Sequence, residues 1–228
     1  APRHQDREYD VDHRGDLFYI RVNDTGRNFR LVTAPVADPR EQNWRELVPH
    51  RPEVMLEGVD LFQDFHVLFE RADGLPRLVV VDARTRRSRT IPVAEPVYSA
   101  APSVNREFAT PLFRYAYQSF ITPSSIYDYD TRTGRSTLLK RTEVLGGYDP
   151  RRYVSERVYA TASDGTRIPV SLVYRRGLRR DGRAPLFLTA YGSYGSPSSV
   201  TFNSNRLSLL DRGVVFALAH IRGGGELG

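Results

Sequence analysis

The most constraining feature of the sequence is a long succession of short, strand-like runs in which apolar and polar residues alternate. They occupy residues 16 to 139, and the clearest are 17–22, 54–62, 65–70, 78–81, 112–120 and 126–129. Alternation with a period of two is typical of half-buried antiparallel strands. Tight-turn dipeptides such as Asp73-Gly74 separate the runs. A short segment at 43–47 is the only candidate helix in this part, so we expect it to be built from strands.

A faint internal repeat indicates how these strands are organised. Val80-Val81-Asp82 with Thr85 matches Asp128-Tyr129-Asp130 with Thr133, 48 residues later. In each copy a strand ends in an aspartate that can hydrogen-bond the following turn. Residues 29–32, followed by Asp38, form a weaker earlier copy. A period of about 40 to 50 residues, with four short strands in each, favours the blades of a β-propeller, and a β-sandwich is the competing architecture.

The pattern changes after Gly146-Gly147. Runs 153–161 and 167–174 flank Asp164-Gly165 as the strands of a hairpin do, and 185–190 is interpreted as a buried strand. A short helix is expected over 206–211, capped by Asn203 or Ser204 and closed by Gly213. The apolar run 214–221 is typical of a parallel strand covered on both faces. Strand, helix and strand in this order predict the opening of an α/β domain.

Two glycine-rich segments, 191–195 and 222–226, follow the two strands of this second part. Reactive groups of α/β sheets lie at the carboxyl ends of strands, and glycine permits close backbone approach there. The alternative interpretation is a pair of tight turns without function. Neither segment fits a nucleotide-binding motif, because 223–225 lacks the G-x-G-x-x-G pattern and no P-loop lysine exists. We therefore expect no cofactor.

The charge of the chain is carried almost entirely by arginine. Of 33 basic residues only Lys140 is lysine, and the formal net charge is +6. A basic chain raises the possibility of nucleic-acid binding. However, 27 acidic residues are interleaved with the arginines, and the two arginine clusters, 84–89 and 175–183, fall where turns are expected. We interpret them as solvated loops and expect no nucleic-acid partner.

Other function classes are excluded by what the sequence lacks. There is no cysteine, which excludes disulfides and thiolate metal sites, and the five histidines show no metal-ligand spacing, so no metal site is expected. No apolar run approaches the roughly 18 residues of a membrane helix, so no membrane partner is expected. The N-terminus lacks the apolar segment of a signal peptide, and a cytoplasmic location is expected, with the periplasm as the alternative.

Many collinear segments resemble the oligopeptidase B group of the prolyl oligopeptidase family of serine peptidases. They include Glu143-Val144-Leu145-Gly146-Gly147-Tyr148-Asp149, Val170-Ser171-Leu172-Val173-Tyr174, Tyr191-Gly192-Ser193-Tyr194-Gly195 and Arg222-Gly223-Gly224-Gly225-Glu226-Leu227-Gly228. The resemblance covers nearly the whole chain. It implies a seven-bladed β-propeller that caps an α/β-hydrolase domain, and hydrolysis of short peptides after arginine or lysine through an acyl-enzyme.

The resemblance also implies a division of the chain. Residues 1–150 would be the later blades of a partial β-propeller, and 151–228 the start of the α/β-hydrolase domain. The sequence contains no G-x-S-x-G, so the serine, acid and histidine of the triad are expected beyond residue 228. Met55 is the only methionine, and the sequence closes just after an apolar run and a glycine cluster. We therefore expect a fragment that is inactive alone and whose partners are short peptides and the rest of the peptidase chain.

The resemblance assigns site roles to four positions, of which two match the family's residues and two depart from them. Tyr191 matches the tyrosine whose hydroxyl donates to the oxyanion of the tetrahedral intermediate, and Tyr194 matches an aromatic position near the substrate pocket. Ser199 and Thr201 stand where this group often carries an acidic pair that attracts a second basic residue of the substrate. Arg222 and Glu226 are expected to organise the loop. The competing hypothesis is a non-catalytic, propeller-derived binding module.

Overall fold

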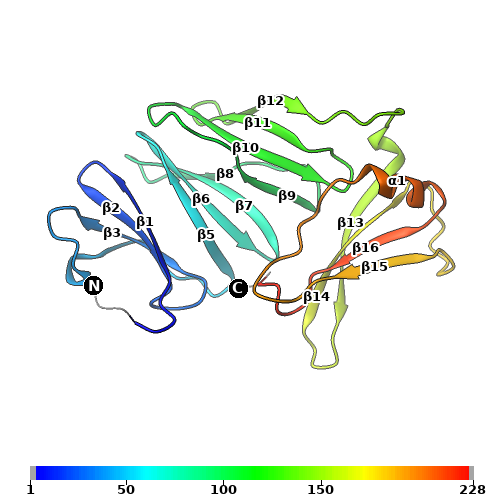
Figure 1. Cartoon of the computed structure of the whole chain (residues 1–228), viewed down its shortest axis with the longest axis horizontal. Coiled ribbons are helices and arrows are strands. Elements are labelled where there is room, and N and C mark those ends of the chain that lie inside the picture. The colour runs from blue at the N-terminus through cyan, green and yellow to red at the C-terminus, as the bar shows by residue number, and fades with distance from the viewer. Residues whose placement is uncertain (1–3, 226–228) are drawn as a thin grey trace.

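The computed structural model describes residues 4–225, which form four four-stranded sheets (Figure 1). In the first three, each strand pairs antiparallel with the next one along the chain. We call these sheets blades 1, 2 and 3. Blade 1 contains β1 (Tyr9–Arg14), β2 (Leu17–Val22), β3 (Arg30–Pro35) and β4 (Arg45–Val48); blade 2 contains β5 (Val54–Leu61), β6 (Phe65–Ala72), β7 (Leu75–Asp82) and β8 (Ser88–Thr90); blade 3 contains β9 (Tyr98–Pro102), β10 (Leu112–Ser119), β11 (Ser125–Asp130) and β12 (Arg135–Arg141).

The internal repeat of the sequence corresponds to equivalent strands of successive blades. Its two clear copies form the ends of β7 and β11, the third strands of blades 2 and 3. Its weaker copy falls at the start of β3, the third strand of blade 1. The carboxylate of Asp82 accepts hydrogen bonds from the backbone N–H of Arg84 at 3.0 Å and from the Thr85 hydroxyl at 2.9 Å. Asp130 likewise accepts from the backbone N–H of Arg132 at 2.9 Å. The predicted aspartate turns are thus confirmed.

Neighbouring sheets share hydrophobic cores, and a separate cluster of Ile20, Val22, Val32 and Ala34 lies within blade 1. Tyr19 and Leu31 of blade 1 pack with Leu68 of blade 2, whereas Val67 of blade 2 packs with Phe113 of blade 3. Adjacent residues of β6 therefore enter different cores, because successive side chains of a strand point to opposite faces. A chain of meander sheets that share cores pairwise is the packing of propeller blades. It is not the single two-layer core of a β-sandwich.

The fourth sheet has a different connectivity. Its strands β13 (Tyr153–Thr161), β14 (Arg167–Arg175), β16 (Val215–Ala219) and β15 (Leu186–Ala190) lie in the order β13-β14-β16-β15. The β15–β16 pair is parallel, and helix α1 (Ser204–Asp211) lies in the connection between them. Asn203 caps α1 by accepting a hydrogen bond from the backbone N–H of Asn205 at 2.9 Å, as predicted. The predicted strand–helix–strand unit is therefore present.

Two local predictions were wrong. The candidate helix at 43–47 is instead a 3₁₀ turn, Glu41–Asn43, followed by strand β4, because residues 45–48 pair with β3. A second 3₁₀ turn spans Pro150–Arg152. The second wrong prediction concerns the run 185–190. It was expected to be buried, yet Leu186, Phe187 and Leu188 of β15 are 52–59% exposed. This strand pairs only with β16, and no other described element covers it.

Blade 3 and the fourth sheet meet in a shared core. Phe120, just after β10, packs edge-on against Phe216 of β16 with ring centroids 5.4 Å apart. The guanidinium of Arg206, from α1, lies 4.0 Å from the Phe216 ring centroid and 4.8 Å from that of Phe120. Burial there lowers the pKa of Arg206 to about 10. The apolar contact fixes the fourth sheet beside blade 3, where Figure 1 shows it.

Candidate functional site

The two glycine-rich segments lie together at the carboxyl end of the parallel pair β15–β16. The backbone N–H of Gly195 donates to the carbonyl of Gly223 at 2.9 Å. A Cβ on Gly192 would run into the carbonyl oxygen of Arg222, and one on Gly223 would run into the carbonyl of Gly192. Backbone therefore packs directly on backbone, which only glycine permits at these two positions. This contact sets the position of the residues that flank it.

Tyr191 and Tyr194 occupy different environments in the first of these loops. Tyr191 is half exposed, and its carbonyl accepts a hydrogen bond from the Ser198 hydroxyl at 3.4 Å. Tyr194 is 94% exposed and adopts a left-handed backbone with φ +57°. The Ser198 contact ties Tyr191 to the segment that contains Ser199, whereas the Tyr194 side chain extends into solvent.

Ser199 and Thr201 are separated by the buried side chain of Val200. Ser199 lines a pocket, whereas Thr201 is not among the residues that line it, and its carbonyl accepts a hydrogen bond from Arg206 at 2.9 Å. The structure therefore brings Tyr191 and Ser199 into one region and leaves Tyr194 and Thr201 at its margin. Glu226, the remaining residue of the family motif, lies outside the described residues.

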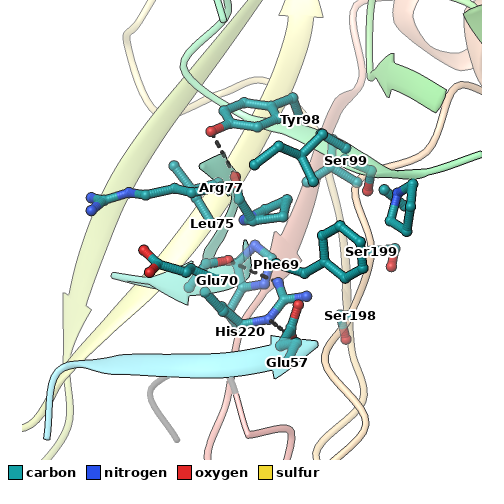
Figure 2. A pocket seen from close by; sticks show the side chains of 18 residues that line it. Glu57, Phe69, Glu70, Leu75, Arg77, Tyr98, Ser99, Ser198, Ser199 and His220 are labelled. Atoms are coloured by element: carbon teal, nitrogen blue, oxygen red, sulfur yellow. Dashed lines mark hydrogen bonds and ion pairs between the residues drawn. The ribbon is translucent and has the colours of Figure 1, made fainter. Parts of the chain in front are cut away.

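The pocket that contains Ser199 lies between blades 2 and 3 and the fourth sheet, and it encloses about 220 Å³ (Figure 2). Blade 2 contributes β5, β6, the turn at Gly74 and the first half of β7, and blade 3 contributes β9. The opposite wall consists of 198–200 and His220, which follows β16. In the view of Figure 2, Glu57, Ser198 and His220 lie at one end and Tyr98 at the other. Sequence segments more than 140 positions apart thus meet here.

Hydrogen bonds and ion pairs fix the polar side chains of this pocket. Glu57 Oε1 accepts from Nε of Arg71 at 2.6 Å, and Arg71 also donates to the carbonyl of Gly74 at 3.5 Å. Glu70 is 5% exposed and is paired with Arg51. The Tyr98 hydroxyl donates to the carbonyl of Pro76 at 2.9 Å, and burial raises the pKa of that hydroxyl.

A serine–histidine pair borders the pocket but is not arranged for catalysis. Ser171 Oγ and His220 Nε2 are 2.8 Å apart. Ser171 is completely buried in β14 and His220 is 6% exposed. A nucleophile must reach the substrate carbon, and the Ser171 hydroxyl has no access to it. The pair is a buried hydrogen bond between neighbouring strands.

An ion pair that the sequence did not predict anchors the second glycine-rich loop. Arg222 contacts the carboxylate of Asp164, which lies in the turn between β13 and β14. The hydrogen bond from Arg222, followed by those from Thr166, lowers the pKa of Asp164 to about 2. The sequence marked Asp164-Gly165 only as a turn, and no local pattern indicates that its partner lies 58 residues later.

The turn between β6 and β7 is joined to β13 by a second polar contact. The Tyr159 hydroxyl donates to Asp73 Oδ2 at 2.8 Å, and Arg157 contacts both the carbonyl and the carboxylate of Asp73. The Arg157 side chain is only 10% exposed, and its Nε and Nη1 have no hydrogen-bond partner in the described part of the chain. Asp73 therefore holds blade 2 to the fourth sheet beside the pocket.

Residues 4–225 contain no group of three or more histidine, cysteine, aspartate or glutamate side chains that could hold a metal ion. Over the same residues, no helix is long and apolar enough to cross a membrane.

The sequence model of the family described as "Prolyl oligopeptidase, N-terminal beta-propeller domain" matches residues 1–142. Dipeptidyl aminopeptidase BI of Pseudoxanthomonas mexicana is 47% identical over the whole chain, which covers 32% of that protein.

Solved structures of oligopeptidase B share the arrangement of the whole chain. The enzyme from Leishmania major superimposes with a TM-score of 0.91 at 34% identity, and that from Trypanosoma brucei, in a closed form with covalently bound antipain, with a TM-score of 0.90 at 34% identity. Each alignment covers 100% of this chain and 33% of the other. The chain thus spans about a third of the length of these relatives.

Proposed function

The chain belongs to the prolyl oligopeptidase family of peptidases, and from this premise we propose that it is part of a serine peptidase that hydrolyses short peptides. The observation that carries the proposal is the pocket between the blades and the fourth sheet, which adjoins the loop of Tyr191. A pocket between two structural units is a common location of a substrate site. In this proposal the nucleophile, acid and general base belong to the part of the peptidase outside this chain.

Residues 1–150 are assigned in this proposal to a partial β-propeller and residues 151–228 to the start of an α/β-hydrolase domain. Support comes from the meander sheets before residue 142 and from the parallel pair β15–β16 with α1 in its connection. The exposed apolar side chains of Leu186, Phe187 and Leu188 also support it, because an internal strand of a larger sheet carries such residues. Helices of the rest of the domain would cover these side chains, and a further strand would pair with the open edge of β15.

Tyr191 is proposed as the donor to the oxyanion of the tetrahedral intermediate. It follows β15 directly, at the carboxyl end of a parallel strand, and it is half exposed. Such a donor acts mainly in the transition state, because negative charge on the carbonyl oxygen develops only there. Tyr194, Ser199 and Thr201 are proposed to contact the substrate, with Ser199 at the pocket itself.

Two specificities are compatible with these residues. The resemblance to oligopeptidase B favours cleavage after arginine or lysine. The relative named dipeptidyl aminopeptidase BI favours the release of dipeptides from a free amino end. Ser199 and Thr201 carry no charge, so they do not supply the acidic pair that would attract a second basic residue. The two specificities differ in whether blocking the amino end of a peptide abolishes hydrolysis.

The experiment is hydrolysis of fluorogenic arginyl peptides, with free and acetylated amino ends, by the full-length peptidase and its Tyr191→Phe variant. Loss of the hydroxyl is expected to lower kcat about 10²- to 10³-fold with little change in KM. An unaltered kcat would remove Tyr191 from the oxyanion site. A full-length protein that cleaves neither peptide but binds both would instead support a non-catalytic binding module.

A further inference from the structure

One acidic side chain of the pocket, that of Glu57, belongs to a residue of β5 that is left out of the regular strand pairing. Leu56 pairs with Glu70 and Gly58 pairs with Phe69, so Glu57 is the extra residue of a β-bulge in β5. A bulge re-aims the side chain of the residue that it leaves unpaired, and bulges are frequent beside binding sites. Glu57 lines the pocket. The bulge is therefore the feature that places a carboxylate in the pocket that Ser199 also lines.

The carboxylate of Glu57 has capacity for a further partner. Only Oε1 takes part in the 2.6 Å ion pair with Arg71, and a carboxylate offers about four acceptor positions on its two oxygens. The Glu57 side chain is 30% exposed, whereas Arg71 is 14% exposed and is held by the Gly74 carbonyl. Arg71 thus fixes the orientation of Glu57 and leaves its second oxygen for a ligand.

The other charged side chains of the pocket are less suited to bind a cation. Glu70 is 5% exposed and already paired with Arg51, and Arg71 and Arg77 are themselves positive. His220 is buried and bonded to Ser171. Among the described residues of the pocket, Glu57 is the carboxylate that a ligand can reach.

The position of Glu57 also relates it to the proposed reaction centre. Ser198 lines the same pocket, and its hydroxyl donates to the carbonyl of Tyr191 at 3.4 Å. A peptide that extends from the Tyr191 loop past Ser198 into the pocket would reach the walls to which Glu57 and Ser199 contribute. A positive charge of the peptide would there find the only accessible acid of the pocket walls described.

We propose that Glu57 binds a cationic group of the peptide substrate in this pocket, and thereby determines specificity in place of acids at positions 199 and 201. This inference rests on the proposed function. The cation is an ammonium or guanidinium group, and it comes either from the free amino end of the peptide or from a basic side chain. Charge-assisted hydrogen bonds to a carboxylate, oriented in advance by Arg71, supply the selectivity.

Binding of three peptide amides tests the proposal without requiring hydrolysis. Ala-Arg amide carries both cations, Ala-Ala amide only the amino end, and N-acetyl-Ala-Arg amide only the side chain. Isothermal titration calorimetry compares the 228-residue chain with its Glu57→Gln variant. The variant is expected to bind the peptides that carry the recognised cation about tenfold or more weakly than the unaltered chain does. Equal affinities of the two proteins for all three peptides would overturn the proposal.

Two further variants keep the result interpretable. Glu46→Gln removes an exposed acid of blade 1, paired with Arg30 at 3.3 Å, and is expected to leave all three affinities unchanged. Ser199→Glu adds an acid to the same pocket and is expected to strengthen binding of the recognised peptide about tenfold. If Glu57→Gln lowers the thermal stability of the chain, the Ser199→Glu variant still tests the site. An affinity of Ser199→Glu for the recognised peptide no higher than that of the unaltered chain would then count against a cation site in this pocket.

The full-length peptidase separates this inference from the proposed function. Glu57→Gln is expected to raise KM for peptides with the recognised cation about tenfold and to leave kcat unchanged. Hydrolysis with a KM independent of Glu57 would overturn the inference and leave the peptidase assignment intact. Glu57-dependent binding by a full-length protein that hydrolyses no peptide would overturn the assignment and retain the binding site.

Discussion

Two tyrosines on neighbouring strands of blade 3 have hydroxyls in opposite situations. The Tyr115 hydroxyl donates to Ser136 Oγ at 2.9 Å. The Tyr129 side chain is completely buried, and its hydroxyl has no hydrogen-bond partner within residues 4–225. A buried polar group without a partner costs free energy, whereas a satisfied one contributes modestly to stability. The two hydroxyls therefore make opposite contributions to the free energy of unfolding.

Replacing each of these tyrosines by phenylalanine tests that difference. Tyr129→Phe is expected to leave the free energy of unfolding unchanged or to raise it. Tyr115→Phe is expected to lower it by about 0.5–1.5 kcal/mol, because the Ser136 hydrogen bond is lost. Urea denaturation of both variants measures the difference. Equal losses in the two variants would contradict the assignment of Tyr129 as unsatisfied.

The ion pair of Asp164 with Arg222 predicts a specific pH dependence. Since the folded-state pKa of Asp164 is about 2 and the ordinary value is 3.8, the carboxylate favours the folded loop above pH 4. That contribution is lost as the pH falls from 4 through 2. Both side chains are half exposed or more, so salt screens the interaction.

Carboxyl chemical shifts measured against pH follow this titration directly. In Arg222→Gln the midpoint for Asp164 is expected to move up towards 3.8. Asp82 is the internal control, because hydrogen bonds from Thr85 lower its pKa and none of them involves Arg222. Its midpoint should stay low in the variant. A low midpoint for Asp164 in Arg222→Gln would show that the turn, and not the ion pair, lowers its pKa.

Single residues differ in how far the sequence reveals their roles. The position of Tyr191 and its neighbouring glycines at the end of a strand was predictable, because a motif and the end of a predicted strand coincide there, and the role of Tyr191 stays a proposal. Glu57 and Asp73 were not, because their roles depend on a β-bulge and on a contact 84 or more positions away. Neither a bulge nor a distant hydrogen bond leaves a periodic pattern in the sequence. The sequence therefore indicated local motifs, but it did not indicate which distant residues contact one another.

At the scale of elements, the strands with an apolar face were predicted, whereas the last strands of blades 2 and 3, β8 and β12, were missed. All residues of β8 and β12 are exposed, and β12 carries arginine or lysine at both ends. Edge strands commonly carry charged side chains, which prevent pairing with other chains, so they lack the alternation that marks a half-buried strand. Four strands per repeat could be inferred only from the length of the repeat.

The contact of the β6–β7 turn with β13 is the element-scale feature that most needs testing. Asp73→Asn keeps a residue type that tolerates the left-handed backbone at φ +52° but removes the charge that compensates buried Arg157. A loss of about 1–3 kcal/mol in the free energy of unfolding is expected. Tyr159→Phe removes one hydrogen bond and should cost less, about 0.5–1.5 kcal/mol. Thermal and urea unfolding compare the two.

The ordering of the two variants is the decisive result for this contact. If Tyr159→Phe destabilises the chain as much as Asp73→Asn, the charge of Asp73 contributes nothing beyond a neutral hydrogen bond. The account of a charge-compensated junction between blade 2 and the fourth sheet would then be wrong. A larger loss for Asp73→Asn supports it.

At the scale of the whole molecule, three meander sheets precede a sheet with a parallel strand pair, and blades 2 and 3 meet this fourth sheet around one pocket. The change of pattern after Gly146-Gly147 predicted this division of the chain. The position of the pocket was not predictable, because it depends on how Phe120, Phe216 and Arg206 pack at the junction. Side-chain packing between distant segments sets that geometry, and no sequence period encodes it.

The central claim is that the Tyr191 loop of this chain contributes to the reaction centre of a peptidase. The most direct test is a structure of the full-length peptidase with a peptide aldehyde bound covalently to its nucleophile. The Tyr191 hydroxyl is predicted to lie within about 2.7–3.1 Å of the oxygen of the tetrahedral adduct. A Tyr191 hydroxyl out of hydrogen-bond range, with another group donating to that oxygen, would contradict the account.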